Sequence, residues 1–259
     1  MSKAMASFDL TGKVSLVTGA TKGLGRAMVQ GLAEAGSDVV VVSRKQELCE
    51  SVAGEVEAST GRRALPLGFH VGDWDAAPGV IDRVYEEFGR LDVLVNNAGI
   101  NPAMTPVTEI TSEYFDKLMS VNLKGPIRLA ALAAPRMGEA GGGSIINVTT
   151  LGAYFGGPGV GTYTSGKAAL NNMTKTMAME WVGMGVRVNA LAPGPFLTEM
   201  MKGTAKYDEQ FIDRSAQATL MKRVADPEEI VPLLLYLASD ASSFVTGEDF
   251  GIGGGMRSN

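Results

Sequence analysis

The sequence predicts a single doubly wound α/β domain with a mostly parallel, seven-stranded sheet. Short runs of apolar residues such as 14–17 and 39–42 recur along the chain, and segments with helical periodicity separate them. Strands that are apolar on both faces are typical of a parallel sheet covered by helices on each side. Alternating strands and helices favour one doubly wound sheet. The 259 residues are enough for one sizeable core, so we expect one domain over residues 1–259.

The composition excludes several classes of protein. A formal net charge of -5 argues against nucleic acid or an anionic membrane as the main partner. Cys49 is the only cysteine and His70 the only histidine, which excludes an intrachain disulfide and disfavours a His/Cys metal cluster. Residues 1–13 contain no apolar run suited to a signal peptide or a membrane span. We therefore expect a cytoplasmic protein with no bound metal.

A glycine-rich turn follows the first predicted strand, and a helical pattern that ends at Gly36 follows the turn. Backbone N–H groups and the helix dipole then point at one place, which makes an anion site. The alternative is a purely structural turn, but the flanking strand and helix favour a dinucleotide site of the Rossmann type. The candidate residues of the turn are Gly19, Thr21, Lys22, Gly23, Leu24 and Gly25.

The end of the second predicted strand distinguishes NADP from NAD. A site for NAD needs a carboxylate here to bind the ribose 2′-hydroxyl. The sequence instead has Ser43 and Arg44, with Lys22 in the glycine turn, and Asp38 lies at the opposite end of the strand. Cations attract a 2′-phosphate, whereas a carboxylate repels it. NADP is favoured over NAD, unless Arg44 is only a solvated start to the next helix.

The remaining elements follow in order. We expect helices at 46–59, 73–88 with Asp73 as N-cap, 111–137, around Tyr163, and 227–237, and strands at 63–69, 91–95, 145–148, 186–191 and 250–252. Residues 196–225 are rich in methionine and are too long for a simple connector, so about 195–225 is predicted to be a substrate lid.

Small or polar residues stand where these strands end, the edge at which ligands gather in open α/β sheets. They are His70 and Val71 after the third strand, Asn97, Ala98 and Gly99 after the fourth, and Thr149 and Thr150 after the fifth. Asn122 lies within a predicted helix, where asparagine costs helix propensity.

Tyr163 and Lys167 are four residues apart, which places them on one face if the segment is helical. A cation about 4 Å from a phenol is worth about 4 kcal/mol at an effective dielectric of ~20. That energy would lower the tyrosine pKa by about 2 to 3 from its ordinary value near 10, into the range of general acid–base catalysis. Taken alone, the pair is more typical of a helix surface.

Together, the glycine turn, the Asn-Asn-Ala-Gly segment ending at Gly99, Asn122, the Tyr163/Lys167 pair and Pro193-Gly194 resemble the short-chain dehydrogenase/reductase family. The resemblance extends from about residue 10 to 255. It implies NAD(P)-dependent oxidoreduction of a carbonyl or alcohol by a homotetramer or homodimer. It also implies that the helices bearing Asn122 and Tyr163 form the main interface.

The resemblance assigns roles to individual residues. Tyr163 would be the acid–base residue, Lys167 would lower its pKa and hold the nicotinamide ribose, and Asn122 would anchor a water for proton transfer. Pro193, Gly194, Phe196 and Thr198 would lie along the nicotinamide end of the cofactor. Two positions depart from the family pattern: Thr150 replaces the usual serine that polarises the carbonyl, and His70 replaces an aspartate that often contacts adenine.

The substrate is expected to be a small-molecule ketone or secondary alcohol. The expected pocket walls are mainly apolar: Met104, Tyr154, Phe155, Phe196, Leu197, Met200 and Met201. Several of these side chains could equally pack the lid onto the domain. A 3-oxoacyl thioester, a sugar and a steroid remain open as substrates. The alternatives are a non-catalytic NADP-binding sensor or scaffold and, less favoured, an epimerase or dehydratase.

Overall fold

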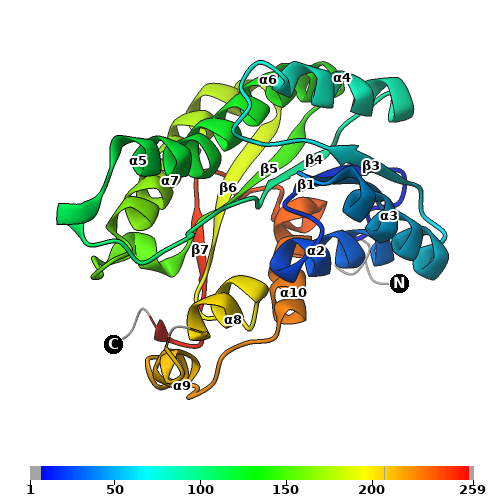
Figure 1. The fold of residues 1–259 in the computed structure, drawn as a ribbon. Helices are drawn as coiled ribbons and strands as arrows, with labels where there is room; N and C mark the ends of the chain where they lie inside the picture. Colours follow the sequence, from blue (N-terminus) through cyan, green and yellow to red (C-terminus); the bar gives the residue numbers. More distant parts are fainter. Residues whose placement is uncertain (1–6, 207, 257–259) are drawn as a thin grey trace.

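A computed structural model describes residues 7–206 and 208–256. Its strands form one parallel sheet in the order β3-β2-β1-β4-β5-β6-β7 (Figure 1). The strands are β1 Val14–Thr18, β2 Asp38–Ser43, β3 Ala64–Gly68, β4 Val93–Asn96, β5 Gly143–Val148, β6 Val186–Pro193 and β7 Asp249–Ile252. The predicted fold class is confirmed, and all seven strands are parallel because β7 also runs parallel to β6.

Helices cover both faces of the sheet, with α4, α6 and α7 on one side and α2, α3 and α10 on the other (Figure 1). Successive strand residues point to opposite faces. Val39 and Val41 accordingly join the core beneath α2, α3 and α10, whereas Val40 and Val42 join the core beneath α4, α6 and α7. This two-sided burial explains why the strands are continuously apolar in sequence.

The helices that the structure describes include one in every segment where a helix was predicted, together with two in the segment predicted as a lid. They are α2 Gly23–Glu34, α3 Gln46–Thr60, α4 Ala77–Phe88, α5 Ser112–Met119, α6 Gly125–Glu139, α7 Gly161–Trp181, α8 Glu199–Ala205, α9 Phe211–Gln217 and α10 Val231–Ala238. Among the described residues, none of the helices combines the length and the apolar character that crossing a bilayer requires.

Three of the predicted helices differ in detail. Asp73 is not the N-cap of α4, because its carboxylate accepts the Ala76 N–H at 3.1 Å in a separate turn before the helix. The predicted helix 111–137 is divided by one π-helical turn, Ser120–Lys124, between α5 and α6. The helix expected at 227–237 starts as a 3₁₀ turn, Pro227–Ile230, before α10, with the Asp226 N–H bonded to Glu229 Oε2 at 2.9 Å.

Strand order places the ligand-binding edge between β1 and β4. The chain leaves β1 toward β2 and β3 on one side, and β4 returns to the other side of β1. The carboxyl ends of parallel strands meet at one edge, and such a reversal leaves a crevice there. The segments after β1, β4, β5 and β6 therefore surround a common space.

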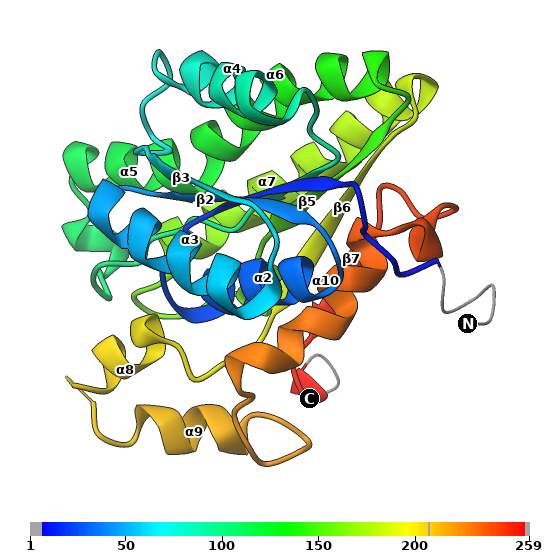
Figure 2. The same cartoon turned by 90° about the vertical axis from the view of Figure 1, so that its right-hand side faces the viewer.

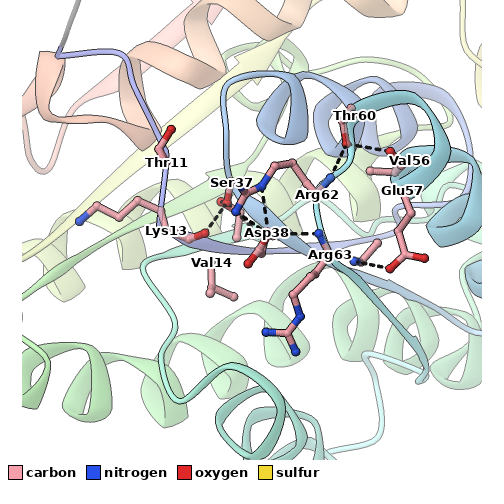
Figure 3. Close-up of polar contacts among 12 residues, drawn as sticks. Thr11, Lys13, Val14, Ser37, Asp38, Val56, Glu57, Thr60, Arg62 and Arg63 are labelled. Atoms are coloured by element: carbon pink, nitrogen blue, oxygen red, sulfur yellow. Dashed lines mark hydrogen bonds and ion pairs between the residues drawn. The ribbon is translucent and has the colours of Figure 1, made fainter.

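Asp38 lies at the opposite edge, where β2 begins (Figure 3). Its Oδ1 accepts hydrogen bonds from Arg62 Nε at 3.0 Å and Nη2 at 2.7 Å, and from the Arg63 backbone N–H at 3.1 Å. This carboxylate has cationic partners of its own and lies a full strand away from the crevice. It is not the carboxylate that an NAD ribose would need.

The segment between β6 and α10 leaves the sheet and returns beside its own start. Ala225 accepts from the Leu197 N–H at 2.8 Å and donates to the Pro195 carbonyl at 3.0 Å. Between these points α8 and α9 lie together at one end of the molecule (Figures 1 and 2). The excursion predicted as a lid is thus closed at its base by backbone hydrogen bonds.

Candidate active site

A cavity of about 480 Å³ opens at the carboxyl edge of the sheet. The residues that line it come from the glycine turn and from the ends of β2, β3, β4, β5 and β6. Those that the sequence predicted are Gly19, Thr21, Lys22, Gly23, Leu24, Gly25, Ser43, Arg44, His70, Val71, Asn97, Ala98, Gly99, Tyr163, Lys167, Pro193, Thr198 and Met200.

The glycine turn has a conformation that side chains would obstruct. Gly19 and Gly23 have φ of +67° and +53°, in the left-handed region. A Cβ on Gly19 would lie 3.0 Å from the Ala98 Cα, and one on Gly25 would lie 2.2 Å from the Gly19 carbonyl oxygen. The turn can therefore pass close to the end of β4 and open α2 toward the cavity only because these positions lack side chains.

Two cations line the cavity, Lys22 from the glycine turn after β1 and Arg44 from the end of β2. Neither forms an ion pair with another residue that the structure describes. Ser43 also lines the cavity, and its hydroxyl accepts from Thr21 Oγ1 at 3.1 Å. The donor set at this end of the cavity suits a phosphate group.

His70 lines the cavity at the end of β3. Its Nδ1 accepts the Gly72 N–H at 3.2 Å, which fixes the ring against the following turn. Val71 is buried beside it. The histidine therefore stands at the edge expected for an adenine contact.

Polar side chains join the ends of β1 and β4. The Asn97 N–H and the Ala98 N–H both donate to Thr18 Oγ1 at 3.0 Å, and Asn97 Nδ2 donates to the Thr18 carbonyl at 2.8 Å. Deeper in the sheet, Asn96 Nδ2 donates to Asn147 Oδ1 at 2.9 Å. These bonds tie β4 to β1 on one side and to β5 on the other.

Asn122 lies in the π-helical turn, and its side chain holds the segment that follows β4. Its Oδ1 accepts the Ile100 N–H at 2.9 Å while its Nδ2 donates to the Ile100 carbonyl at 2.8 Å. A π turn inside a helix redirects one side chain and frequently marks a functional site. Gly99 fits here because an added Cβ would approach Asn122 Oδ1 to 3.1 Å and Lys167 Nζ to 3.4 Å.

Lys167 is buried, with 2% of its surface exposed, although it carries an amine. Its Nζ donates to the Val148 carbonyl at 2.7 Å. Desolvation by burial lowers the pKa of this amine to about 8. Lys167 thus exchanges a proton far more readily near neutral pH than an exposed lysine does.

Tyr163 behaves opposite to our expectation. Burial raises the pKa of its phenol to about 12, and a hydrogen bond with the Thr150 side chain opposes this only in part. The prediction that Lys167 lowers this pKa is wrong for the protein alone. Desolvation is the largest cause of the raised pKa, and the Lys167 amine is bonded to a backbone carbonyl instead. The phenol therefore stays protonated at neutral pH and is available as a donor.

Thr150 stands at the end of β5 next to Tyr163. Its Oγ1 accepts the Gly152 N–H at 3.2 Å and lies 3.5 Å from the Pro193 carbonyl. The hydrogen bond between the Thr150 and Tyr163 side chains brings two hydroxyl groups to one point beside the cavity. Such a pair can donate to one oxygen atom from two directions.

Some predicted residues do not line the cavity. Gly194 packs against Gly253, where an added Cβ would lie 2.8 Å from its Cα, and Phe196 is buried in the core beneath α2 and α10. The predicted catalytic residues Asn122 and Thr150 do not line it either, and the other expected pocket walls that do not are Met104, Tyr154, Phe155, Leu197 and Met201.

Sequence reasoning missed further residues that line the cavity: Phe69, Ile100, Asn101, Pro102, Lys117, Val121, Val148, Thr149 and Glu199. Thr149 was noted only as following a strand. Its buried Oγ1 has no hydrogen-bond partner among the described residues. Lys117 adds a cation to the lining. It lies four residues before Val121, and this helical spacing, which places both residues on one face, could have identified Lys117 as a lining residue.

Comparisons with known proteins identify the family of this chain. A family model described as enoyl-(acyl carrier protein) reductase matches residues 19–257. A 3-oxoacyl-(acyl-carrier-protein) reductase of Thermotoga maritima is 38% identical over 247 residues, covering 95% of this chain and 98% of the relative.

Solved structures of dehydrogenases are similar to this chain over nearly its whole length. A short-chain type dehydrogenase/reductase from Mycobacterium marinum has a TM-score of 0.91 and 34% identity, covering 98% of this chain and 99% of the other. A gluconate 5-dehydrogenase from Burkholderia cenocepacia in complex with NADP and tartrate has a TM-score of 0.94 and 32% identity, covering 99% of both chains. The chain is an oxidoreductase that belongs to the short-chain dehydrogenase/reductase family.

Proposed function

We propose that this protein is an NADP(H)-dependent oxidoreductase that transfers hydride between nicotinamide and a ketone or secondary alcohol. The observation that carries the proposal is that Tyr163 and Lys167 both line the cavity and that the Thr150 side chain is hydrogen-bonded to Tyr163. The cofactor would supply the hydride, and the protein would supply position and electrostatics.

The cavity suits a phosphorylated dinucleotide. The glycine turn offers backbone N–H groups at the start of α2, and an added Cβ at Gly19 would meet the Ala98 backbone. Lys22 and Arg44 have no carboxylate partner among the described residues, and Ser43 lies beside them. This donor set supports binding of a 2′-phosphate, and with it a preference for NADP over NAD.

The catalytic residues have distinct roles. Tyr163, protonated at neutral pH, donates its proton to the carbonyl oxygen, and the Thr150 hydroxyl donates a second hydrogen bond to the same atom. These donors act where negative charge develops, which is where preorganised hydrogen bonds are most effective. A phenol that holds its proton suits the reductive direction.

Lys167 and Asn122 support the proton donor. The Lys167 ammonium, with a pKa of about 8, is a stronger acid than the phenol, so proton return to a Tyr163 phenolate is favourable. Asn122 holds the Ile100 backbone beside this pair and keeps the segment after β4 in place. We also propose that Asn122 binds a water through which protons reach the site.

The cavity lining is predominantly apolar, which supports a moderately hydrophobic small molecule. Met200 lines the cavity, whereas Met104, Phe155 and Met221 are exposed apolar side chains outside its lining. We propose that the α8–α9 segment, about residues 195–225, covers a bound substrate. The likeness to a 3-oxoacyl reductase and to a gluconate dehydrogenase leaves both a thioester and a sugar acid as substrates to test.

We further propose that the whole chain, residues 1–259, forms one domain that acts in the cytoplasm as a homotetramer or homodimer. The alternative of a non-catalytic NADP-binding sensor rests only on threonine replacing serine at position 150. Consumption of NADPH and NADH with a panel of ketones separates the two functions. Turnover with NADPH supports the enzyme, and cofactor binding without turnover of any ketone supports the sensor.

A further inference from the structure

Asn171 links the helix that carries Tyr163 and Lys167 to the segment that carries Thr150. It lies one turn beyond Lys167 on α7. Its Nδ2 donates to Tyr154 Oη at 3.2 Å and also to the Asp249 carboxylate. Tyr154 ends the short 3₁₀ turn Leu151–Tyr154 that follows Thr150, and Asp249 is the first residue of β7.

The direction of the Asn171 amide is determined by Asp249. A carboxylate only accepts hydrogen bonds, so the amide NH₂ must face it, and the second N–H then reaches Tyr154. The Asn171 Oδ1 is buried and has no hydrogen-bond partner among the described residues. A buried acceptor without a hydrogen-bond partner lowers stability. The presence of this amide on α7 therefore needs an explanation other than stability.

The turn after Thr150 is held at its two ends. At its start, the buried Leu151 packs against Gly253 and Gly194, where an added Cβ would lie 2.1 Å and 3.2 Å from the leucine Cδ1. Within the turn, the Ala153 N–H donates to the Thr150 carbonyl at 3.0 Å. At its end, Tyr154 bonds to Asn171, so this amide fixes the turn relative to α7.

We propose that Asn171 is a positioning residue that acts through Tyr154 to keep the Thr150 hydroxyl within hydrogen-bond distance of Tyr163. Asn171 does not line the cavity and does not touch the reacting atoms. The catalytic consequence rests on the proposed function, in which Thr150 and Tyr163 bind one carbonyl oxygen. The structural consequence, that Asn171 fixes the turn Leu151–Tyr154 relative to α7, does not depend on the proposed function.

The structural consequence is tested by hydrogen exchange of residues 150–155 in the full chain. Asn171→Leu removes both hydrogen bonds, and Tyr154→Phe removes one hydroxyl while keeping the ring. Asn172→Leu is the matched control, because Asn172 is the next residue on α7 and is exposed. Exchange of the segment should accelerate about tenfold in the first two variants and stay at the wild-type rate in the control. If residues 150–155 exchanged at the wild-type rate in both Asn171→Leu and Tyr154→Phe, the proposal would be overturned. If Asn171→Leu does not fold, the exchange rate of Tyr154→Phe alone tests the proposal.

The catalytic consequence is tested by steady-state kinetics with NADPH and a ketone. Asn171→Leu should lower kcat about tenfold while the KM for NADPH changes less than about twofold. In a Thr150→Ala background it should have no further effect on kcat, since the residue acts through Thr150. An equal loss in both backgrounds would overturn the proposal. A wild-type protein that reduces no carbonyl would refute the proposed function instead, while the exchange result would still decide the role of Asn171.

Discussion

The buried amine of Lys167 predicts an unusual dependence of stability on pH. In the unfolded chain this lysine titrates near its ordinary pKa of 10.5, whereas burial lowers the value to about 8 in the folded protein. Between these two values the unfolded chain binds the extra proton, so the free energy of unfolding rises with pH. This contribution is complete above pH 10.5 and is lost as the pH falls through about 8.

The magnitude follows from the two pKa values. The difference of 10.5 minus 8 corresponds to roughly 3 kcal/mol in total, and about 2.5 kcal/mol of this should develop between about pH 7 and pH 10. Replacing the amine by a methionine of similar length removes this titration. The stability of the wild type relative to Lys167→Met should therefore increase by about 2.5 kcal/mol over that range.

Urea denaturation of both proteins at several pH values measures the effect. The same substitution at Lys175, an exposed lysine of α7, serves as the control. Tyr163 is present in both proteins, and its raised pKa reduces stability only above about pH 10, where the unfolded chain loses a proton that the folded chain keeps. If the difference between wild type and Lys167→Met were the same at pH 7 and pH 10, the buried amine would not carry the lowered pKa.

Two further experiments test the site. Thr150→Ala removes the second donor to the carbonyl oxygen and should lower kcat by about 10- to 100-fold, whereas Thr150→Ser should retain activity. Both rates are measured by NADPH oxidation. Turnover of Thr150→Ala within about twofold of the wild type would show that this hydroxyl is not catalytic. Replacing both Lys22 and Arg44 by alanine should raise the KM for NADPH by about 100-fold and change the KM for NADH little, because only NADPH carries the 2′-phosphate. An equal loss with both cofactors would contradict the proposed phosphate site.

The parts of this fold that the sequence could predict are those with a local pattern. The strand at 39–42 is apolar on both faces, and the glycine turn ending at Gly25 lies between a strand and a helix, so both were predicted correctly. Thr111 was expected to start a long helix, and it caps α5 by accepting the Tyr114 N–H at 3.2 Å. Patterns of this kind depend on residues that are close in sequence.

Features that depend on distant residues were not predicted. The π turn at Asn122 arises where its amide bonds the Ile100 backbone, 22 residues away. Phe196 was expected near the cofactor, but its apolar ring is buried in the core. Whether the pKa of Tyr163 is raised or lowered depends on how deeply the phenol is buried. The four-residue spacing of Tyr163 and Lys167 does not reveal this burial. The contact between Asn171 and Asp249 spans 78 residues and has no local signature.

The role of Tyr163 as the proton donor is tested most directly by single-turnover reduction of a ketone with Tyr163→Phe and bound NADPH. This variant removes one oxygen atom and leaves the ring in place. We expect NADPH to bind this variant with a Kd within about twofold of wild type, whereas the rate of NADPH oxidation should fall by about 10²- to 10⁴-fold. A variant that binds NADPH and still oxidises it at the wild-type rate would show that another group donates the proton.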